Sequence, residues 1–281
     1  MTGLFRRDIF WFGIWIGGLT VLGVWDALFL NTPAFLLVGT AFMNTLIACV
    51  VVVALSLLLG WSVGVLLHLL ETRSRVLYLP VTFVLNIVRS VPQIVGTLIG
   101  YVLLTLFIER EILRSDISQL LWMAVVITLC VFLEIVDLVR ERITYYRTLD
   151  FYHAMLVCGI KESRIINREI LWKNSRAHLL NKLVSIFGAA IFLQCSIDFI
   201  VSVGLSTDVS LSNFPVTLGS LLAKLDSKQD ILAIGTAVTN PSYISSLFFQ
   251  HLQGISIAVI IVFTLFCMYR ISDALVKQHR L

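Results

Sequence analysis

The sequence predicts an all-α integral membrane protein with about six transmembrane helices. Of its 281 residues, 58% are hydrophobic and only 14% are charged, whereas a soluble domain carries about 25% charged residues. The mean hydropathy is correspondingly high, at +0.95. The apolar residues also gather in long runs, and a helix needs roughly 20 of them to cross about 30 Å of hydrocarbon.

Six apolar stretches have the length of a membrane span. The first follows Arg6 and Arg7, and no small-residue cleavage site comes after it, so we expect a retained helix and not a signal peptide. The second and third are longer than one crossing needs, which favours tilt or an extension beyond the bilayer. The stretches are approximately residues 10–30, 41–70, 80–108, 120–139, 183–204 and 254–271.

The basic residues predict how these spans are oriented. With the N-terminus in the cytoplasm, 16 of the 21 Lys and Arg residues fall on the cytoplasmic side, as the positive-inside rule requires. Both termini are therefore expected to be cytoplasmic. Residues 1–40 would form the first membrane helix and an outer connector, and residues 41–281 the main membrane domain, with a cytoplasmic loop at about 140–182 and a long external loop at about 205–253.

No motif in the sequence points to catalysis or to a cofactor. The five cysteines are scattered without a CxxC pair, which favours neither a metal site nor a disulfide framework. The pattern GxxxxGK[ST] is absent, so we expect the chain to have no ATPase of its own. The tryptophans are interpreted as interfacial and lipid-facing aromatics, and we expect no nucleic-acid partner.

The loop at 140–182 is too long and too patterned for a simple connector. We expect two short helices broken at Gly159, the first of them capped by Asp150. In the second helix, Ile166 and Ile170 are four residues apart and share one face. An amphipathic helix of this kind either lies on lipid headgroups or docks into a groove on a partner, and the pattern fits both.

These residues resemble the EAA loop of permease subunits in binding-protein-dependent ABC importers. The tripeptide His153-Ala154-Met155 stands where the family has Glu-Ala-Ala, Gly159 stands at the loop glycine, and residues 170–172 stand at Ile-Leu-Pro. Residues 159–166 are similar to the Gly-Ala-Ser-x-x-Arg-Ile-Ile run of the dipeptide, oligopeptide and nickel branch.

The resemblance covers roughly residue 41 to the C-terminus and is strongest over residues 140–199. Three typical positions differ, because His153, Met155 and Trp172 replace the family's residues. The Gly-Thr-Asp…Gly-Arg-Asp segment that usually precedes the second span is also missing.

The resemblance implies a bacterial inner-membrane permease whose loop docks on a cytoplasmic ATPase. Implied partners are a second homologous permease, ATP-binding subunits that hold ATP and magnesium, and an extracytoplasmic substrate-binding protein, while this chain would hold no cofactor. The external loop resembles the region that meets the binding protein, with a disordered spacer as the alternative. The implied ATPase-coupling residues are His153, Ala154, Gly159, Lys161, Glu162, Arg164, Ile166, Arg168 and Ile170.

Polar residues inside the spans are candidates for the translocation path. Arg89 lies about 13 Å past the start of the third span at 1.5 Å per residue, and an unpaired cation at such a depth costs at least about 2.5 kcal/mol. Arg89 is therefore expected either to line the path or to pair with Glu134 or Asp137. In the third span, the path candidates are Arg89, Ser90 and Pro92, and Pro92 is expected to kink the helix. In the fifth span, the candidates are Gln194 and Asp198, which lie one turn apart on a face that we expect to look into the bundle.

Other functions remain open at this stage. The solute of an importer of this kind could be a peptide, an amino acid, an opine or a metal chelate. A secondary transporter or channel would use Arg89, Glu134 and Asp198 as ion or proton sites. A scaffold that transports nothing would use the loop only to anchor a cytoplasmic protein.

Overall fold

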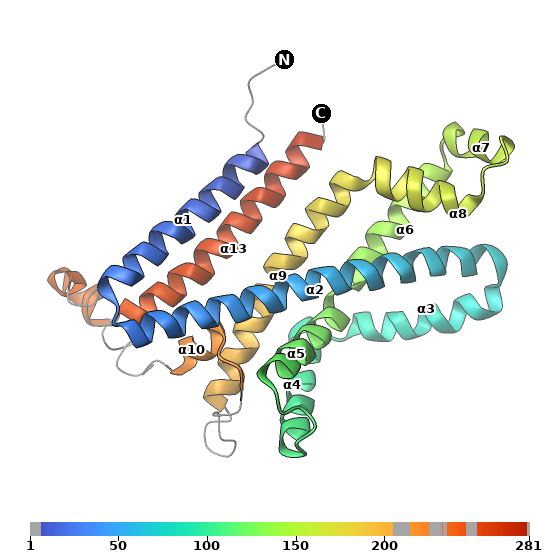
Figure 1. The fold of residues 1–281 in the computed structure, drawn as a ribbon. Coiled ribbons are helices and arrows are strands. Elements are labelled where there is room, and N and C mark those ends of the chain that lie inside the picture. Colours follow the sequence, from blue (N-terminus) through green and yellow to red (C-terminus); the bar gives the residue numbers. More distant parts are fainter. Residues whose placement is uncertain (1–6, 205–213, 225–231, 233–234, 246–251, 280–281) are drawn as a thin grey trace.

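The computed structural model describes residues 7–204, 214–224, 232, 235–245 and 252–279, and every regular element among them is a helix (Figure 1). Four helices are long and apolar enough to cross a membrane, and two bent helix pairs bring the number to six if each pair is one span. For this part of the chain, the predictions of an all-α fold and of several membrane-spanning helices are confirmed.

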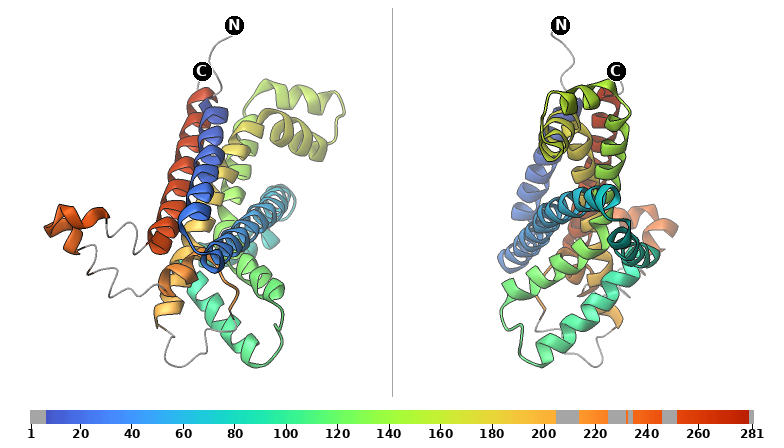
Figure 2. Two further views of the ribbon diagram at one scale, coloured as in Figure 1. Left: turned by 60° about the vertical axis from the view of Figure 1, so that its left-hand side comes forward. Right: turned by 90° about the vertical axis from the view of Figure 1, so that its right-hand side faces the viewer.

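The first and last helices form an antiparallel pair. Helix α1 (Arg7–Phe29) runs beside α13 (Leu252–His279) in both views (Figures 1 and 2). Trp15 Nε1 donates a hydrogen bond to Thr264 Oγ1 at 3.3 Å, and Ser256 Oγ lies 2.7 Å and 2.6 Å from the two carboxylate oxygens of the buried Asp26. The start of α1 and the end of α13 therefore lie at the same end of the molecule.

Helix α2 (Thr32–Arg73) runs for 42 residues without a break. It begins at Asn31, whose side chain accepts a hydrogen bond from the Ala34 amide at 3.0 Å and so satisfies a free amide of the first turn. Gly60 and Gly64 bring α2 close to α6 (Leu133–Arg147), since an added Cβ would lie 2.5 Å or 2.7 Å from a side-chain atom of that helix. The two helices therefore pack tightly along the middle of α2.

The expected third span is interrupted, not merely kinked. Helix α3 (Arg75–Ser90) folds back along α2, and α4 (Gln93–Glu109) leaves at an angle of 91°. The break falls at Val91 and Pro92. Proline lacks a backbone N–H and disfavours helical geometry in the residue before it, and Val91 is indeed extended, with φ −80° and ψ 122°. The prediction of one kinked helix over residues 80–108 was wrong in this respect.

The remaining long helices complete the bundle. Helix α5 (Asp116–Val131) joins α6 with a bend of 41°, and α9 (Arg176–Gly204) forms the fifth predicted span. Val52 of α2, Ile127 of α5, Ile135 of α6 and Ile186 of α9 are all buried in one apolar cluster. This shared core holds the elements that carry the candidate sites.

Part of the long loop predicted to be external turns back into the bundle. Short helix α10 (Leu218–Lys224) packs against α9 and α2. The Leu218 amide donates a hydrogen bond to Thr45 Oγ1 at 3.1 Å, and Asn44 Nδ2 donates to the Val216 carbonyl at 2.8 Å. The described residues 214–224 are therefore no loose spacer. Farther along the chain, Asn240 caps a short 3-10 helix (Pro241–Tyr243), and its side chain accepts a hydrogen bond from the Ser242 amide at 3.3 Å.

Candidate functional site

The loop between α6 and α9 folds into a hairpin, defined here as residues 149–175. It contains α7 (Asp150–Val157), α8 (Glu162–Arg164) and a π-helix (Ile165–Asn174). Both ribbon views place it at the end of the molecule where α1 begins (Figures 1 and 2). The predicted break at Gly159 is confirmed, because its φ of +77° is a conformation that glycine adopts readily.

The expected cap of the first helix differs. Leu149 occupies the cap position and makes no side-chain cap hydrogen bond. Asp150 lies one residue later, inside the first turn. A carboxylate there still favours the positive end of the helix dipole, so the residue type suits the position although the predicted capping bond is not formed.

The apolar face of the second helix points inward. Ile165, Ile166, Ile170 and Leu171 are 0% exposed and belong to the protein's main core. We expected Ile166 and Ile170 to present a docking face, and that expectation was wrong for these side chains. An apolar stripe shows only that the face is buried, and here the chain's own core buries it.

The outer face of the hairpin carries the other coupling candidates. All of these except Glu162 are exposed: His153, Ala154, Gly159, Lys161, Arg164 and Arg168. Two apolar side chains of the hairpin that were not among the coupling candidates are exposed as well, Val157 by 88% and Trp172 by 64%. An eight-residue helix such as α7 is too short for its apolar periodicity to show which side faces out, which is why Val157 was missed.

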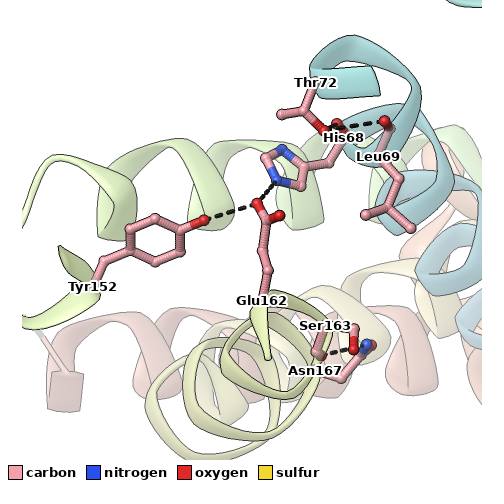
Figure 3. Close-up of polar contacts among 7 residues, drawn as sticks. All are labelled: His68, Leu69, Thr72, Tyr152, Glu162, Ser163 and Asn167. Carbon is pink, nitrogen blue, oxygen red and sulfur yellow. Dashed lines mark hydrogen bonds and ion pairs between the residues drawn. The ribbon is translucent and has the colours of Figure 1, made fainter. Parts of the chain in front are cut away.

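Glu162 points away from the outer face, toward α2. Its Oε1 accepts a hydrogen bond from the Tyr152 hydroxyl at 2.8 Å and lies 3.2 Å from His68 Nε2 (Figure 3). We call these three residues the clasp. Since a carboxylate offers no hydrogen, His68 donates from Nε2. Glu162 was grouped with the outward coupling residues, and the structure corrects this placement.

The electrostatics of the clasp fix its donor and acceptor roles. Partial burial raises the pKa of Glu162, but the hydrogen bonds from Tyr152 and His68 outweigh this effect and hold the pKa below its ordinary value. Burial, together with the bond to Glu162, raises the pKa of Tyr152 to about 12. Near neutral pH the carboxylate is therefore an anionic acceptor and the phenol a donor.

A second tie joins α2 to the hairpin. Trp61 Nε1 donates a hydrogen bond to Asn167 Oδ1 at 2.7 Å, and Asn167 Nδ2 donates to the Ser163 carbonyl at 2.9 Å (Figure 3). Trp61 was interpreted as an interfacial or lipid-facing aromatic, and the hydrogen bond that its indole donates to the loop was not predicted. The sequence signal was the spacing of Trp61 and His68, since residues seven apart share one helix face.

A group of charged and polar side chains lies open along α3, α4, α6 and α9. Arg89 Nη2 lies 2.5 Å from Asp137 Oδ1, so one of the two predicted partners of Arg89 is confirmed. Glu134 accepts a hydrogen bond from Gln93 at 3.1 Å and forms an ion pair with Lys182 at 2.9 Å. We call Arg89, Gln93, Glu134, Asp137 and Lys182 the charged strip.

The charged strip is accessible in this chain. The side chains of Arg89 and Asp137 are 47% and 55% exposed, and the neighbouring Ser90 and Pro92 are exposed as well. Charged groups that face hydrocarbon are costly, and they usually face a bundle interior or a water-filled cavity. This face therefore requires water or another protein surface against it.

Asp198 and Gln194 do not join the charged strip. Asp198 is 4% exposed and accepts hydrogen bonds from Tyr101 at 2.6 Å and Thr217 at 2.5 Å. Gln194 is fully buried, and its Oε1 lies 3.5 Å from Cys49 Sγ. The prediction that this face looks into the bundle is confirmed. We also expected the two residues to line an open path, and the structure does not show this, because both lie inside the core of the single chain.

The comparison with known proteins adds no family. No family model matches the chain, and no curated protein matches it. The hairpin and the charged strip are therefore the features of the molecule that indicate a function.

Proposed function

We propose that this chain is the transmembrane permease subunit of an ABC importer, which moves peptides or a similar small solute delivered by a substrate-binding protein. The observation that carries the proposal is the hairpin, a folded element at one end of the helix bundle that is hydrogen-bonded to α2 at Trp61 and His68. Its position between α6 and α9 and its resemblance to an EAA loop fit a coupling element.

The outer face of the hairpin suits a protein partner. Phe151, Leu156 and Val157 are exposed apolar side chains on α7, and the exposed Lys161 and Arg164 follow nearby. An apolar centre with a charged rim is the usual composition of a docking surface. The partner proposed for it is a cytoplasmic ATP-binding subunit, which supplies ATP, magnesium and hydrolysis.

The hairpin end of the molecule is the proposed cytoplasmic side. The start of α1 and the end of α13 lie at this end (Figure 1), and Arg7, Arg270 and Lys277 belong to these helix ends. Basic residues concentrate on the cytoplasmic side of bacterial membrane proteins. The proposed location is therefore the bacterial inner membrane with both termini inside.

The charged strip supports a paired permease. Lys182 lies about 9 Å after the start of α9 at Arg176, and Glu134 lies about 20 Å before the end of α6 at Arg147, so the strip extends from near the hairpin into the bundle. A second homologous permease that covers the strip would enclose a polar path between the two chains. The strip carries both positive and negative groups, as a free peptide does at neutral pH.

The experiment is recovery of ATPase subunit per permease after detergent extraction, together with ATP-dependent uptake in vesicles. Val157→Asp places a charge on the apolar outer face, and Gly159→Val strains the turn, since a side chain at φ +77° is disfavoured. Both variants should keep membrane yield and lose at least about tenfold in ATPase recovery and uptake, because buried interface positions dominate binding.

Lys161→Ala is the matched control on the rim and should keep both quantities within about twofold. Full ATPase recovery and uptake by Val157→Asp would refute the docking role. Unchanged uptake without any ATPase would favour a secondary transporter. Loss of hairpin binding to anionic vesicles, with ATPase recovery unaffected, would favour the lipid-surface role of the loop.

A further inference from the structure

The position of α7 depends on very few contacts. Tyr152 is the one buried side chain that α7 contributes, whereas the following π-helix contributes four. Met155 of α7 and Ile160 of the turn are only partly buried against the main core, and an added Cβ at Gly159 would meet nothing within 4 Å. Tyr152 is therefore the deepest anchor of the proposed docking helix, through its ring and its hydroxyl.

That hydroxyl belongs to a bond network that closes the turn. Tyr152 and Glu162 lie on opposite sides of Gly159, and His68 reaches the same carboxylate oxygen from α2. The guanidinium of Arg147, at the end of α6, lies 6.0 Å from the centre of the Tyr152 ring. Hydrogen bonds to an ionised acceptor are stronger than neutral ones, so the Glu162 carboxylate holds α2, α7 and α8 together.

We propose that Tyr152 and His68 are positioning residues: through Glu162 they set the orientation of α7 relative to α2, so that movement of the docking helix is passed to α2. This inference rests on the proposed permease function for its physiological meaning. The geometry distinguishes it from a purely stabilising role, because the π-helix is already held by its own buried isoleucines. The clasp is needed to orient α7 and not to fold the hairpin.

The first test measures orientation directly and needs no ATPase. Spin labels at Arg73→Cys and Val157→Cys, both exposed positions, report the distance between α2 and α7 after the exposed Cys158 is replaced by serine. We expect a narrow distance distribution in the otherwise unchanged chain. Tyr152→Phe and His68→Leu should broaden it at least about twofold, because each removes one donor from Glu162.

The controls separate the donor from the shape of the side chain. His68→Gln keeps an N–H donor and should keep the narrow distribution. Glu71→Gln changes a charge on the same exposed helix end and should also leave it narrow. Glu162→Gln serves as a second variant if His68→Leu fails to fold. An unchanged width in both Tyr152→Phe and Glu162→Gln would overturn the proposal.

The second test measures coupling in the assembled transporter. Tyr152→Phe should retain at least half of the bound ATPase while solute moved per ATP hydrolysed falls about fivefold or more, and His68→Gln should stay close to the unchanged chain. An unaltered ratio in Tyr152→Phe would overturn the coupling role. If the unchanged chain binds no ATPase, the proposed function fails, while the distance measurement still decides the positioning role.

Discussion

Two tyrosine–carboxylate hydrogen bonds hold this chain together in different surroundings. Tyr101 donates to Asp198 at 2.6 Å inside the helix bundle, and Tyr152 donates to Glu162 at 2.8 Å in the hairpin. Asp198 is 4% exposed, and its second oxygen is occupied by Thr217. The Glu162 side chain is 32% exposed, and its other donor is a histidine.

The difference separates a permanent bond from an adjustable one. Asp198 has both oxygens occupied by hydroxyl groups from different elements, and water cannot replace either bond in the core. Glu162 can exchange a donor for water at modest cost, because part of its carboxylate is already solvated. The pair in the bundle is suited to fixing the fold, whereas the pair in the hairpin is suited to an element that moves.

The largest effect should come from removing the buried carboxylate. Asp198→Ala leaves the Tyr101 and Thr217 hydroxyls without their acceptor, at about 1–3 kcal/mol each. We expect monodisperse protein recovered by size-exclusion chromatography to fall at least about fivefold. Glu162→Ala is the matched variant and should keep yield within about twofold. Equal yields from the two variants would remove the distinction.

Asp137 can be compared with Asp198 and Glu162, because its partner is the cation Arg89 and the pair is exposed. Arg89→Ala should leave folded yield within about twofold, since exposed pairs contribute little to stability, and should reduce uptake at least about tenfold. Arg114→Ala breaks another exposed pair, with Glu111, and is the control that should transport normally. A collapse in yield with Arg89→Ala would assign that pair to the fold instead.

Removing the hydroxyl of Tyr101 or of Tyr152 should have a smaller effect on stability, and the effect should differ between the two. Tyr101→Phe removes a fully buried bond to a carboxylate, which costs about 1.5–3 kcal/mol, and Tyr152→Phe removes a partly solvated one, which costs about 1 kcal/mol. The apparent Tm in detergent should therefore fall further for Tyr101→Phe. The reverse order would show that the hairpin bond is the more important one for stability.

The smallest effect is a shift in titration at the hairpin. The fold favours the protonated phenol of Tyr152, whose pKa is raised to about 12, so the contribution of Tyr152 to the clasp is fully present below the ordinary pKa of about 10 and is lost as pH rises through about 12. Phenolate absorbance of the chain minus that of Tyr152→Phe measures this step. Glu162→Gln should lower the Tyr152 pKa, because it removes the charged acceptor, while Arg147 and His68 remain in place.

At acid pH the clasp is weakened in the opposite direction, as pH falls and Glu162 gains a proton. The pKa of Glu162 is held below its ordinary value, so its contribution to the clasp is present above about 4.3 and is lost as pH falls through the lowered value. Spin-label distances across the clasp should broaden at that limit as well as above about pH 12. A distribution that stays narrow at both extremes would show that Glu162 does not control α7.

Much of the fold could be predicted because each membrane helix corresponds to a continuous run of about 20 apolar residues in the sequence. Six apolar runs gave the long helices, and Gly159 gave the turn of the hairpin. The break at Pro92 was expected only as a kink, since a proline shows that the helix is disturbed but not through what angle. The 91° bend depends on the packing of α3 along α2.

The sites were less predictable because their partners lie far apart in the sequence. Tyr101 is 97 residues from Asp198, and His68 is 94 from Glu162, so no local pattern links them. Ile166 shows a second limit, because an amphipathic helix reveals that one face is buried without revealing whether the chain or a partner buries it. Arg89 was easier, since a cation among apolar residues needs a nearby anion.

Helix α2 carries a mechanical consequence through its length. At Thr45 it is bound to the start of α10, and at His68 to the hairpin, two points about 34 Å apart along one unbroken helix. If α2 moves as a rigid helix, a rotation of about 5° around one of these two points displaces the other by about 3 Å. That is the length of a hydrogen bond, so a slight tilt of α2 is enough to exchange the contacts at Thr45 or at His68.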